Sequence, residues 1–350
     1  MKNLWYNIMR AYLKVGLYFL HKKISVFGQE NIPKNGAVLF IGNHQNALID
    51  AILIPITTSR NIHFLTRASA FKKGFIEKFL KSLNMIPVYR IRDGIRTIEK
   101  NIYSFEQCFE ILNEEGAVEI FAEGNHDLKR QIRPLKKGFA RIILGTLQKY
   151  PDLEIQIVPV GFNYDSHLNF PSSVSIHYGK PILANDFIDT KNPDVRFSKI
   201  INKVSLALKE LTLNIEDSNN YDKIIAKLNA LKVNYTNLDE VNKMVENIEL
   251  DTFEIISKKR NFNWFTPIHL IAKLNSIFPL LIWKYLKPSI SDIVFTNTFR
   301  FALITTLFPL FYLIQTAIVY YFFNLKYALI YLVSCILLGV ISTKTITINL

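Results

Sequence analysis

The sequence predicts an α/β fold, in which a mixed sheet with flanking helices is followed by a helical segment and a C-terminal membrane hairpin. Between residues 24 and 185, short runs rich in β-forming residues alternate with longer stretches of helical periodicity, which is the pattern of an α/β domain. Near the C-terminus, the run 301–323 carries no charged residue. It exceeds the roughly 20 residues that a transmembrane helix needs.

The composition excludes a disordered chain and narrows the partners of a basic protein. Hydrophobic residues make up 49% of the 350 residues, and the formal net charge is +13. Such a charge suits nucleic acid or an anionic membrane surface. Because much of the aromatic content lies in the presumed membrane segments, we expect membrane lipids as partners and no nucleic acid. The two cysteines are far apart in the sequence, which predicts no disulfide and a reducing, cytoplasmic setting.

Residues 1–25 are expected to form an amphipathic helix in the membrane interface. Apolar and aromatic side chains recur there at helical spacing over residues 3–22, interrupted by Arg10 and Lys14, as in interfacial helices. These basic residues also break up the apolar core that a cleavable signal peptide needs. A helix that packs on its own domain is the alternative interpretation.

Residues 26–190 are expected to form the α/β domain. Its β-rich runs are short, as strands are, and its helical stretches are longer. The predicted strands are 37–41, 117–121, 155–160 and 173–178, and the predicted helices are 71–83, 95–115 and 138–149.

The rest of the chain is expected to be helical. Residues 191–260 are charged, rich in Asn and free of Gly and Pro after Pro193, which predicts a helical insert or linker. Residues 261–350 are expected to form a membrane-associated region. Within it, transmembrane helices over 301–323 and 327–342 would be joined by a short turn into a hairpin.

The apolar stretch 264–286 is a separate case, because Pro267 and Pro279 interrupt it. Such interruptions suit an interfacial or re-entrant segment better than a lipid-facing helix, and the sequence alone leaves both open. Arg300 and Lys344 flank the predicted hairpin on one side. Basic residues that flank transmembrane helices tend to lie on the cytoplasmic side of the membrane. The sequence therefore predicts an integral membrane protein with its α/β domain on the cytoplasmic face.

His44 and Asp50 are the candidate catalytic pair. His44 follows the strand 37–41 and precedes an apolar helix, so it should lie at the carboxyl edge of the sheet, where active sites of open α/β sheets gather. Asp50 is near enough in sequence to orient one imidazole nitrogen, so that the other takes a proton from a hydroxyl group as a general base. Taken alone, the pair is also explained by a loop histidine and a helix-surface charge.

Further candidate residues follow the later strands. Arg side chains bind phosphate oxygens through two parallel hydrogen bonds, and basic residues at a helix N-terminus favour anions. Each candidate taken alone is also explained as a solvated charge, a turn or a strand end, so it is their order along the chain that carries the prediction. The candidates for substrate binding are Arg67, Arg90, Arg92, Glu123, Gly124, Lys136, Lys137 and Pro159.

In this order, the segments resemble the glycerolipid acyltransferases of the PlsC-like superfamily. That superfamily carries an Asn-His…Asp block, a Gly-x-Ile-Pro-Val-x-Arg-like block, a Phe-Pro-Glu-Gly block and a Val-Pro block, and similar segments here lie between residues 26 and 185. The resemblance implies that His44 and Asp50 form a catalytic dyad. It also implies that Arg90 and Glu123-Gly124 help to bind a phosphate-bearing acceptor and that Pro159 shapes the floor of the site.

The resemblance also bears on the donor and on one more residue. Family members are associated with membranes and take acyl groups from a thioester, acyl-CoA or acyl-carrier protein, as co-substrate. No bound cofactor is implied. Arg67 stands where relatives often have a lysine, so it is an additional candidate for acceptor binding.

Three departures from the family pattern leave the acceptor open. Five residues separate His44 from Asp50 where most relatives have four, Ala122 replaces the usual proline, and Asn84 stands where many relatives have glycine. The longer spacing is similar to the branch that includes glycerol-3-phosphate and dihydroxyacetone-phosphate acyltransferases. Lysophosphatidic acid, glycerol 3-phosphate and a non-phosphate lyso-aminolipid all remain candidate acceptors.

Other classes of protein have weaker support. The sequence contains no Gly-x-Ser-x-Gly elbow of a serine esterase and no His-Glu-x-x-His pattern of a zinc enzyme. We therefore expect direct transfer without an acyl-enzyme and without a catalytic metal. A noncatalytic membrane protein that binds lipid is the alternative from another class, and it predicts that substitution of His44 changes nothing.

Overall fold

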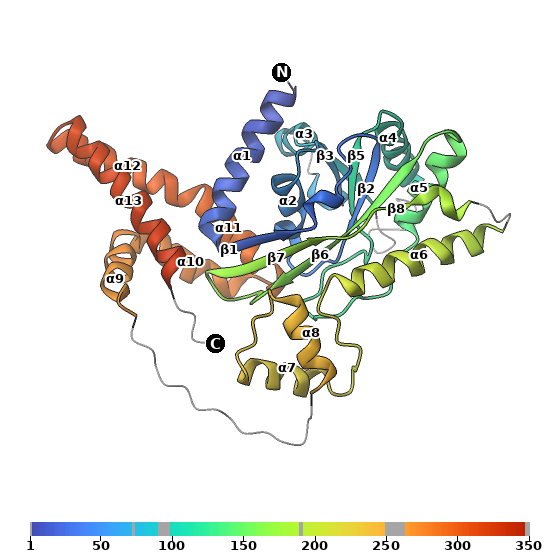
Figure 1. The fold of residues 1–350 in the computed structure, drawn as a ribbon. Coiled ribbons are helices and arrows are strands. Elements are labelled where there is room, and N and C mark those ends of the chain that lie inside the picture. The colour runs from blue at the N-terminus through green and yellow to red at the C-terminus, as the bar shows by residue number, and fades with distance from the viewer. Residues whose placement is uncertain (1, 72–73, 90–98, 189–191, 249–262, 347–350) are drawn as a thin grey trace.

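The computed structural model describes residues 2–71, 74–89, 99–188, 192–248 and 263–346 (Figure 1). In this part of the chain, the domain is built on a mixed sheet with the strand order β1-β7-β6-β2-β5-β3-β4, in which β8 pairs with β6. The predicted α/β fold is confirmed. The strands are β1 (His21–Phe27), β2 (Ala37–Gly42), β3 (Ile62–Arg67), β4 (Met85–Val88), β5 (Ala117–Phe121), β6 (Ile155–Tyr164), β7 (Ser172–Tyr178) and β8 (Ile182–Leu183).

The strand directions bring several loops to one edge of the sheet. β2 is parallel to both β5 and β6, and β3 is parallel to both β5 and β4. Only the pairings of β7 and β8 with β6 are antiparallel among the described strands. The carboxyl ends of β2, β3, β4, β5 and β6 therefore share an edge, which is where open α/β sheets place their ligands.

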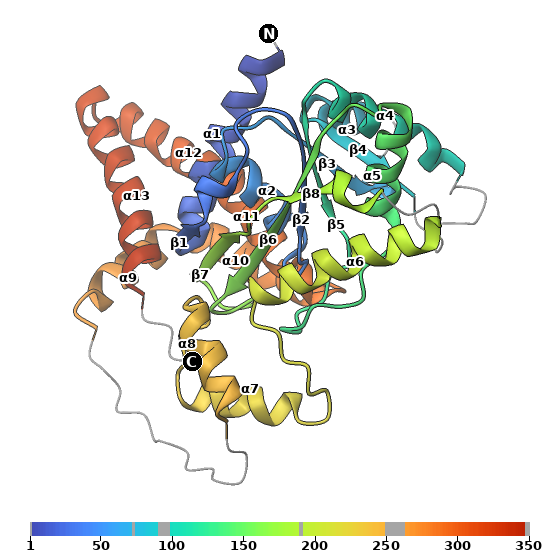
Figure 2. The ribbon, with the colours of Figure 1, turned by 45° about the vertical axis from the view of Figure 1, so that its right-hand side comes forward.

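Helices cover both faces of the sheet, which explains why β2 is a continuous apolar run. On one face, α2 (Ala47–Thr57) packs against Val38 and Phe40 of β2. On the other face, Leu39 and Ile41 join a second core with α4, α5 and α6, and Figure 2 shows α6 lying across the sheet. The helices of this second face are α4 (Asn101–Asn113), α5 (Gly138–Lys149) and α6 (Pro193–Glu210); α3 (Phe75–Ser82) precedes β4.

The N-terminal helix is shorter than predicted. α1 spans Lys2–Leu20, and residues 21–25 belong to β1, because β1 pairs in parallel with β7. α1 packs on its own domain, as the alternative interpretation has it, and its place in the membrane interface stays a prediction. Leu17 and Leu20 are buried in the domain core, while Leu4 and Ile8 leave an apolar face exposed.

The segment after residue 190 begins inside the domain rather than beyond it. α6 places Ile200, Val204 and Leu208 in the core under the sheet, so a boundary between residues 190 and 191 does not separate the domain from a linker. The helical periodicity was visible in the sequence, but its packing partner was not. The next two helices, α7 (Tyr221–Ala230) and α8 (Leu238–Glu246), form a small apolar cluster of their own.

The C-terminal region contains the predicted hairpin. Among the described residues, two helical segments are long and apolar enough to cross a membrane, Ile293–Phe322 and Leu325–Thr345. The first contains α11 (Thr296–Thr305) and α12 (Leu307–Phe322), and the second is α13. The predicted spans 301–323 and 327–342 fall on these helices, and Figure 1 shows α12 and α13 projecting from the sheet.

The interrupted stretch before the hairpin is bent. α9 (Thr266–Asn275) and α10 (Ile277–Leu286) meet at an angle of 80°. The bend falls at Ser276, three residues before Pro279, whose missing N–H and fixed φ disfavour continuation of a straight helix from before it. The two helices thus form either a broken span or a re-entrant segment, as the interrupting prolines indicated.

Glu119 is a carboxyl group buried in the middle of β5. Neither of its oxygens has a hydrogen-bond partner among the described residues. Burial, reinforced by the charge of Asp50, raises the pKa of Glu119 well above its usual value. At a pH above the pKa that Glu119 has in the unfolded chain, the unfolded chain loses this proton while the folded protein keeps it. The contribution of Glu119 to the free energy of unfolding therefore falls as the pH rises.

We expect Glu119→Met to stabilise the protein, because methionine has a similar shape and no polar atom to desolvate. The gain in the free energy of unfolding should be about 1–3 kcal/mol at pH 8 and smaller at pH 5. Denaturant unfolding of the detergent-solubilised protein at both pH values measures it. A gain that is equal at both pH values would show that the pKa of Glu119 is not raised in the folded state.

Candidate active site

The loop between β2 and α2 carries His44 and is fixed to the neighbouring strand. The Asn43 side chain donates to the carbonyl oxygen of Phe162 over 3.1 Å and accepts from the Phe162 amide over 2.7 Å. This pair of hydrogen bonds extends the contact between β2 and β6 by one residue. His44 therefore leaves the sheet at its carboxyl edge in a defined position, as the sequence predicted.

Asp50 folds back from the first turn of α2 onto the imidazole of His44. The His44 Nδ1 and Asp50 Oδ2 atoms are 3.0 Å apart. The same carboxylate oxygen accepts from the backbone amides of Gln45 and Asn46 over 2.8 and 2.7 Å, and the Tyr164 hydroxyl donates to Oδ1 over 2.6 Å. The Asp50 side chain is fully buried, so it is not the helix-surface charge of the alternative interpretation.

The hydrogen bonds around Asp50 fix the tautomer of His44. A carboxylate only accepts hydrogen bonds, so Nδ1 of a neutral His44 carries the proton and Nε2 carries the free lone pair. Burial and the neighbouring Asp50 raise the pKa of Tyr164 well above its usual value, so its hydroxyl remains a donor. With Nδ1 turned toward Asp50, the lone pair of His44 Nε2 is the one that could accept a proton.

Aromatic side chains hold the ring of His44. It stacks on Phe121, at the end of β5, with ring centroids 4.1 Å apart and planes inclined by 14°. The His126 ring lies 5.6 Å away and almost perpendicular to it. The His44 side chain remains 16% exposed, so the ring is restrained but accessible.

Glu123 and Gly124 follow β5, as predicted, but Glu123 already has a partner. Its carboxylate is buried and forms an ion pair with Arg133, which also contacts Asn125. Burial outweighs Arg133 and raises the pKa of Glu123 to about 7. Gly124 has a φ of +77°, which a side chain would strain, and the backbone there approaches the side chain of Lys136.

The predicted basic residues divide into two groups. Arg67 ends β3 at the same sheet edge, where its side chain is exposed and its Nε donates to Ser69, and Lys136 is exposed beside Gly124. Lys137, in contrast, points to α6, where it lies 3.6 Å from the Asp194 carboxylate. Arg90 and Arg92 lie outside the described residues.

Pro159 is not at a strand end. β6 continues to Tyr164, and Pro159 lies opposite Ile41 within the sheet. Strand alternation puts its side chain on the face opposite Val158 and Val160, which pack on the α2 side. The sequence Val-Pro-Val-Gly had indicated a terminus, but proline and glycine are tolerated here because the strand runs on beside β7. The predicted strand end is therefore wrong, while a role for Pro159 in shaping the floor of the site stays a prediction.

The segment that leads into the first apolar span also reaches the site. The Asp292 Oδ2 atom lies within hydrogen-bond distance of His126 Nε2, at 3.0 Å. The Phe295 ring packs edge-on against the His126 ring, with centroids 4.9 Å apart. Asn297 donates to the carbonyl oxygen of His167 over 2.9 Å. The His167 side chain in turn lies 3.0 Å from Gln45 Oε1, in the loop of His44.

These contacts were not predicted from the sequence. Asp292 lies 166 residues from His126, and no local pattern connects them. Tyr164 was missed as well, because its side chain is set by the register of β6 rather than by a motif. Among the described residues, no group of three or more His, Cys, Asp or Glu side chains is placed to hold a metal ion.

The known proteins that this chain resembles are acyltransferases. Residues 23–163 match the family model described as Acyltransferase. Glycerol-3-phosphate O-acyltransferase 2 of Saccharomyces cerevisiae is 22% identical, over 58% of this chain and 41% of its own. 1-acyl-sn-glycerol-3-phosphate acyltransferase of Borreliella burgdorferi is 30% identical, over 40% of this chain and 53% of its own. The chain thus spans about half or less of these curated relatives.

Among solved structures, the 1-acyl-sn-glycerophosphate acyltransferase PlsC from Thermotoga maritima is similar with a TM-score of 0.44 and 17% identity. The similarity covers 60% of this chain and 81% of that one.

Proposed function

We propose, from the match of residues 23–163 to the Acyltransferase family model, that the protein acylates a glycerophospholipid precursor. The acyl group would come from a thioester, acyl-CoA or acyl-carrier protein. The acceptor hydroxyl would belong to lysophosphatidic acid or glycerol 3-phosphate. The observation that carries the proposal is the 3.0 Å contact between His44 and a fully buried Asp50.

The dyad supports a direct transfer. Nε2 of His44 would take the proton of the acceptor hydroxyl while the hydroxyl oxygen attacks the thioester carbonyl, and Asp50 would stabilise the resulting imidazolium. This attack would form the C–O bond of the new ester and give a tetrahedral intermediate. The intermediate would then collapse by breaking its C–S bond. The imidazolium returns its proton to the departing thiolate, so no acyl-enzyme forms.

The charges at the sheet edge support an acceptor that carries phosphate. Arg67 and Lys136 are exposed at this edge, and we assign them to the phosphate, together with Arg90 and Arg92. Glu123 would act indirectly, by holding Arg133 beside the site. Lys137, which faces Asp194, receives no role in binding.

The contacts of Asp292 and Asn297 support a lipid substrate at a membrane. They bring the start of the apolar span Ile293–Phe322 to the loops around His44. An acceptor whose acyl chain remains in the bilayer could therefore present its head group to the dyad. The basic residues Arg300 and Lys344 at the two ends of the hairpin support a catalytic domain on the cytoplasmic face.

An acceptor screen tests the proposal. The full chain, purified in detergent, is incubated with labelled acyl-CoA or acyl-carrier protein and with lysophosphatidic acid, glycerol 3-phosphate or a lyso-aminolipid. We expect labelled phosphatidic acid or lysophosphatidic acid as product. Transfer only to the lyso-aminolipid would overturn the phosphate acceptor, and no transfer to any acceptor from either donor would overturn the enzyme assignment.

A further inference from the structure

A basic groove lies at the end of the domain opposite the dyad. It has a volume of about 880 Å³ and is lined by α1, β1, the C-terminal end of α2 and the last turn of α13. The dyad precedes and begins α2, whereas the groove borders its last residues, Ile56 and Thr57. A helix of this length separates the two by about 16 Å, so the groove is not part of the candidate active site.

The lining of the groove is strongly positive. Five basic side chains contribute to it, and no Asp or Glu is among its described lining residues. In the part of the chain that the structure describes, none of the five forms an ion pair with a carboxylate. Concave surfaces lined by one sign of charge concentrate counter-ions. The five are Arg10, Lys14, Lys22, Lys23 and Lys344.

Part of this charge is held in place by the fold. The Lys344 ammonium group donates to the carbonyl oxygens of Tyr18 and His21 over 2.8 and 2.7 Å, and it lies 3.7 Å from the centre of the Tyr18 ring. An ammonium group has three N–H donors, so one remains for a ligand. Lys14 and Lys23 are exposed and complete the positive wall.

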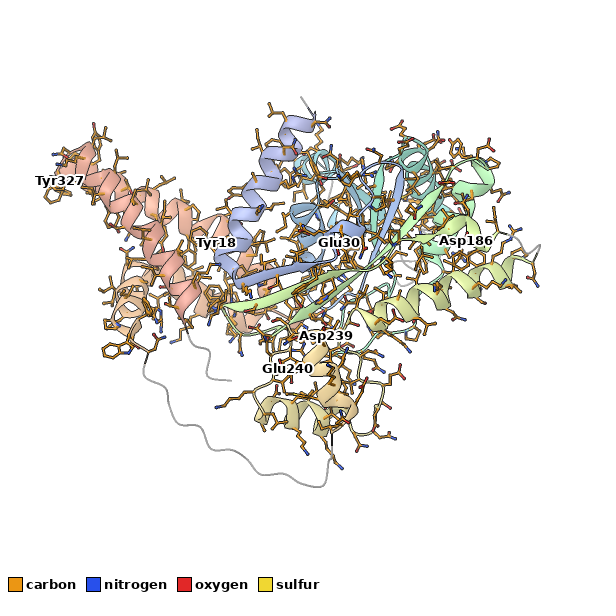
Figure 3. All side chains as sticks on the ribbon, in the orientation of Figure 1. Tyr18, Glu30, Asp186, Asp239, Glu240 and Tyr327 are labelled. Atoms are coloured by element: carbon orange, nitrogen blue, oxygen red, sulfur yellow. The ribbon has the colours of Figure 1, made fainter. Side chains whose placement is uncertain are left out.

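The groove borders the C-terminal end of the second apolar span. Lys344 is in the last turn of the span Leu325–Thr345, and Figure 3 shows Tyr18 at the base of the hairpin and Tyr327 at its far end. The groove side of α1 adjoins its exposed apolar face, which includes Leu4 and Ile8. A helix of this kind lies in the interface between head groups and acyl chains.

We propose that this groove binds the phosphate head group of an anionic phospholipid, as a site separate from the acyl acceptor. The hydrogen-bonded Lys344 ammonium and the exposed Lys14 and Lys23 would contact the phosphate, and the apolar face of α1 would lie along the acyl chains. The proposal does not depend on the catalytic mechanism, because no residue of the dyad contributes to the groove.

The test measures lipid retention by the purified full-length protein. The protein is equilibrated in mixed micelles that contain phosphatidylglycerol or phosphatidylcholine at equal mole fraction, and the bound lipid is quantified by extraction and mass spectrometry. We expect selective retention of phosphatidylglycerol. The double variant Lys14→Gln/Lys23→Gln should weaken it about 25-fold, since each basic residue near an anionic surface contributes about fivefold. Both side chains are exposed, and neither forms a hydrogen bond to another of the described residues.

The matched control is Lys199→Gln/Lys203→Gln, which removes two exposed lysines from α6 and should leave retention unchanged. Equal retention of the two lipids, or equal effects of the two double variants, would overturn the proposal. Inorganic phosphate serves as a competitor. Displacement of the lipid by millimolar phosphate, with direct phosphate binding that the groove variant also loses, would assign the groove to soluble phosphate esters and so overturn the lipid source.

Discussion

Replacing His44 with alanine should slow acyl transfer by about 10²–10⁴-fold, the usual contribution of a positioned general base. The fold should survive the substitution. Asp50 would lose one partner but keep the two backbone amides and the Tyr164 hydroxyl, so its buried carboxylate remains hydrogen-bonded. The measurement is the initial rate with saturating acceptor and donor, accompanied by the thermal unfolding midpoint.

His177→Ala is the matched control for this experiment. His177 also stacks on a phenylalanine, Phe27, with ring centroids 4.7 Å apart, but it lies on β7, two strands away from the strand β2 that leads to His44. The control should retain the wild-type rate. Unchanged transfer by His44→Ala would eliminate the dyad mechanism and favour a noncatalytic, lipid-binding protein.

Asp50→Asn should reduce the rate by about 10–10³-fold, because an adjacent carboxylate favours the protonated form of its partner by one to three pKa units. The amide can preserve much of the geometry. The amide oxygen would accept from His44 and the two backbone amides. The NH₂ group would stand in the place of Oδ1, so it would donate to the Tyr164 hydroxyl, whereas Oδ1 accepts from that hydroxyl. The loss therefore reports the negative charge of Asp50, and the unfolding midpoint should change far less than the rate.

The double variant His44→Ala/Asp50→Asn provides the decisive comparison. If Asp50 acts only through His44, the double variant should be no slower than His44→Ala alone, because residues that act as a unit are not additive. Asp165→Asn is the control, since Asp165 also accepts from two backbone amides, those of Ser166 and Ser173, but has no histidine among its described partners. Additive losses would show that Asp50 acts independently of His44.

The parts of the molecule that could be predicted from sequence are those set by local pattern. The buried strands 37–41 and 117–121 and the helix 138–149 were identified because hydrophobic periodicity is decided within a few residues. The approach of Asp50 to His44 was predictable for the same reason, since both lie on one loop and one helical turn. The apolar spans were identified from length and composition alone.

The features that were missed depend on contacts between distant segments. Residues 21–25 became a strand because β7 offers them a parallel partner, and tertiary pairing overrides a weak helical pattern. α6 joined the core because its apolar stripe meets the sheet. Asp292 reached His126 only because the chain returns to the active-site edge before it enters the apolar span, and no sequence interval encodes that return.

The contact of Asp292 with His126 fixes the position of the α/β domain relative to the apolar span that begins at Ile293. Arg300, three residues after Asn297, also donates to the carbonyl oxygen of Leu168 in the loop that follows β6. Several hydrogen bonds thus connect the loops around His44 to the N-terminal end of the first apolar span. Under the proposed function, these contacts would fix the height of the His44 imidazole above the bilayer, and this height would limit how far a head group must rise to be acylated.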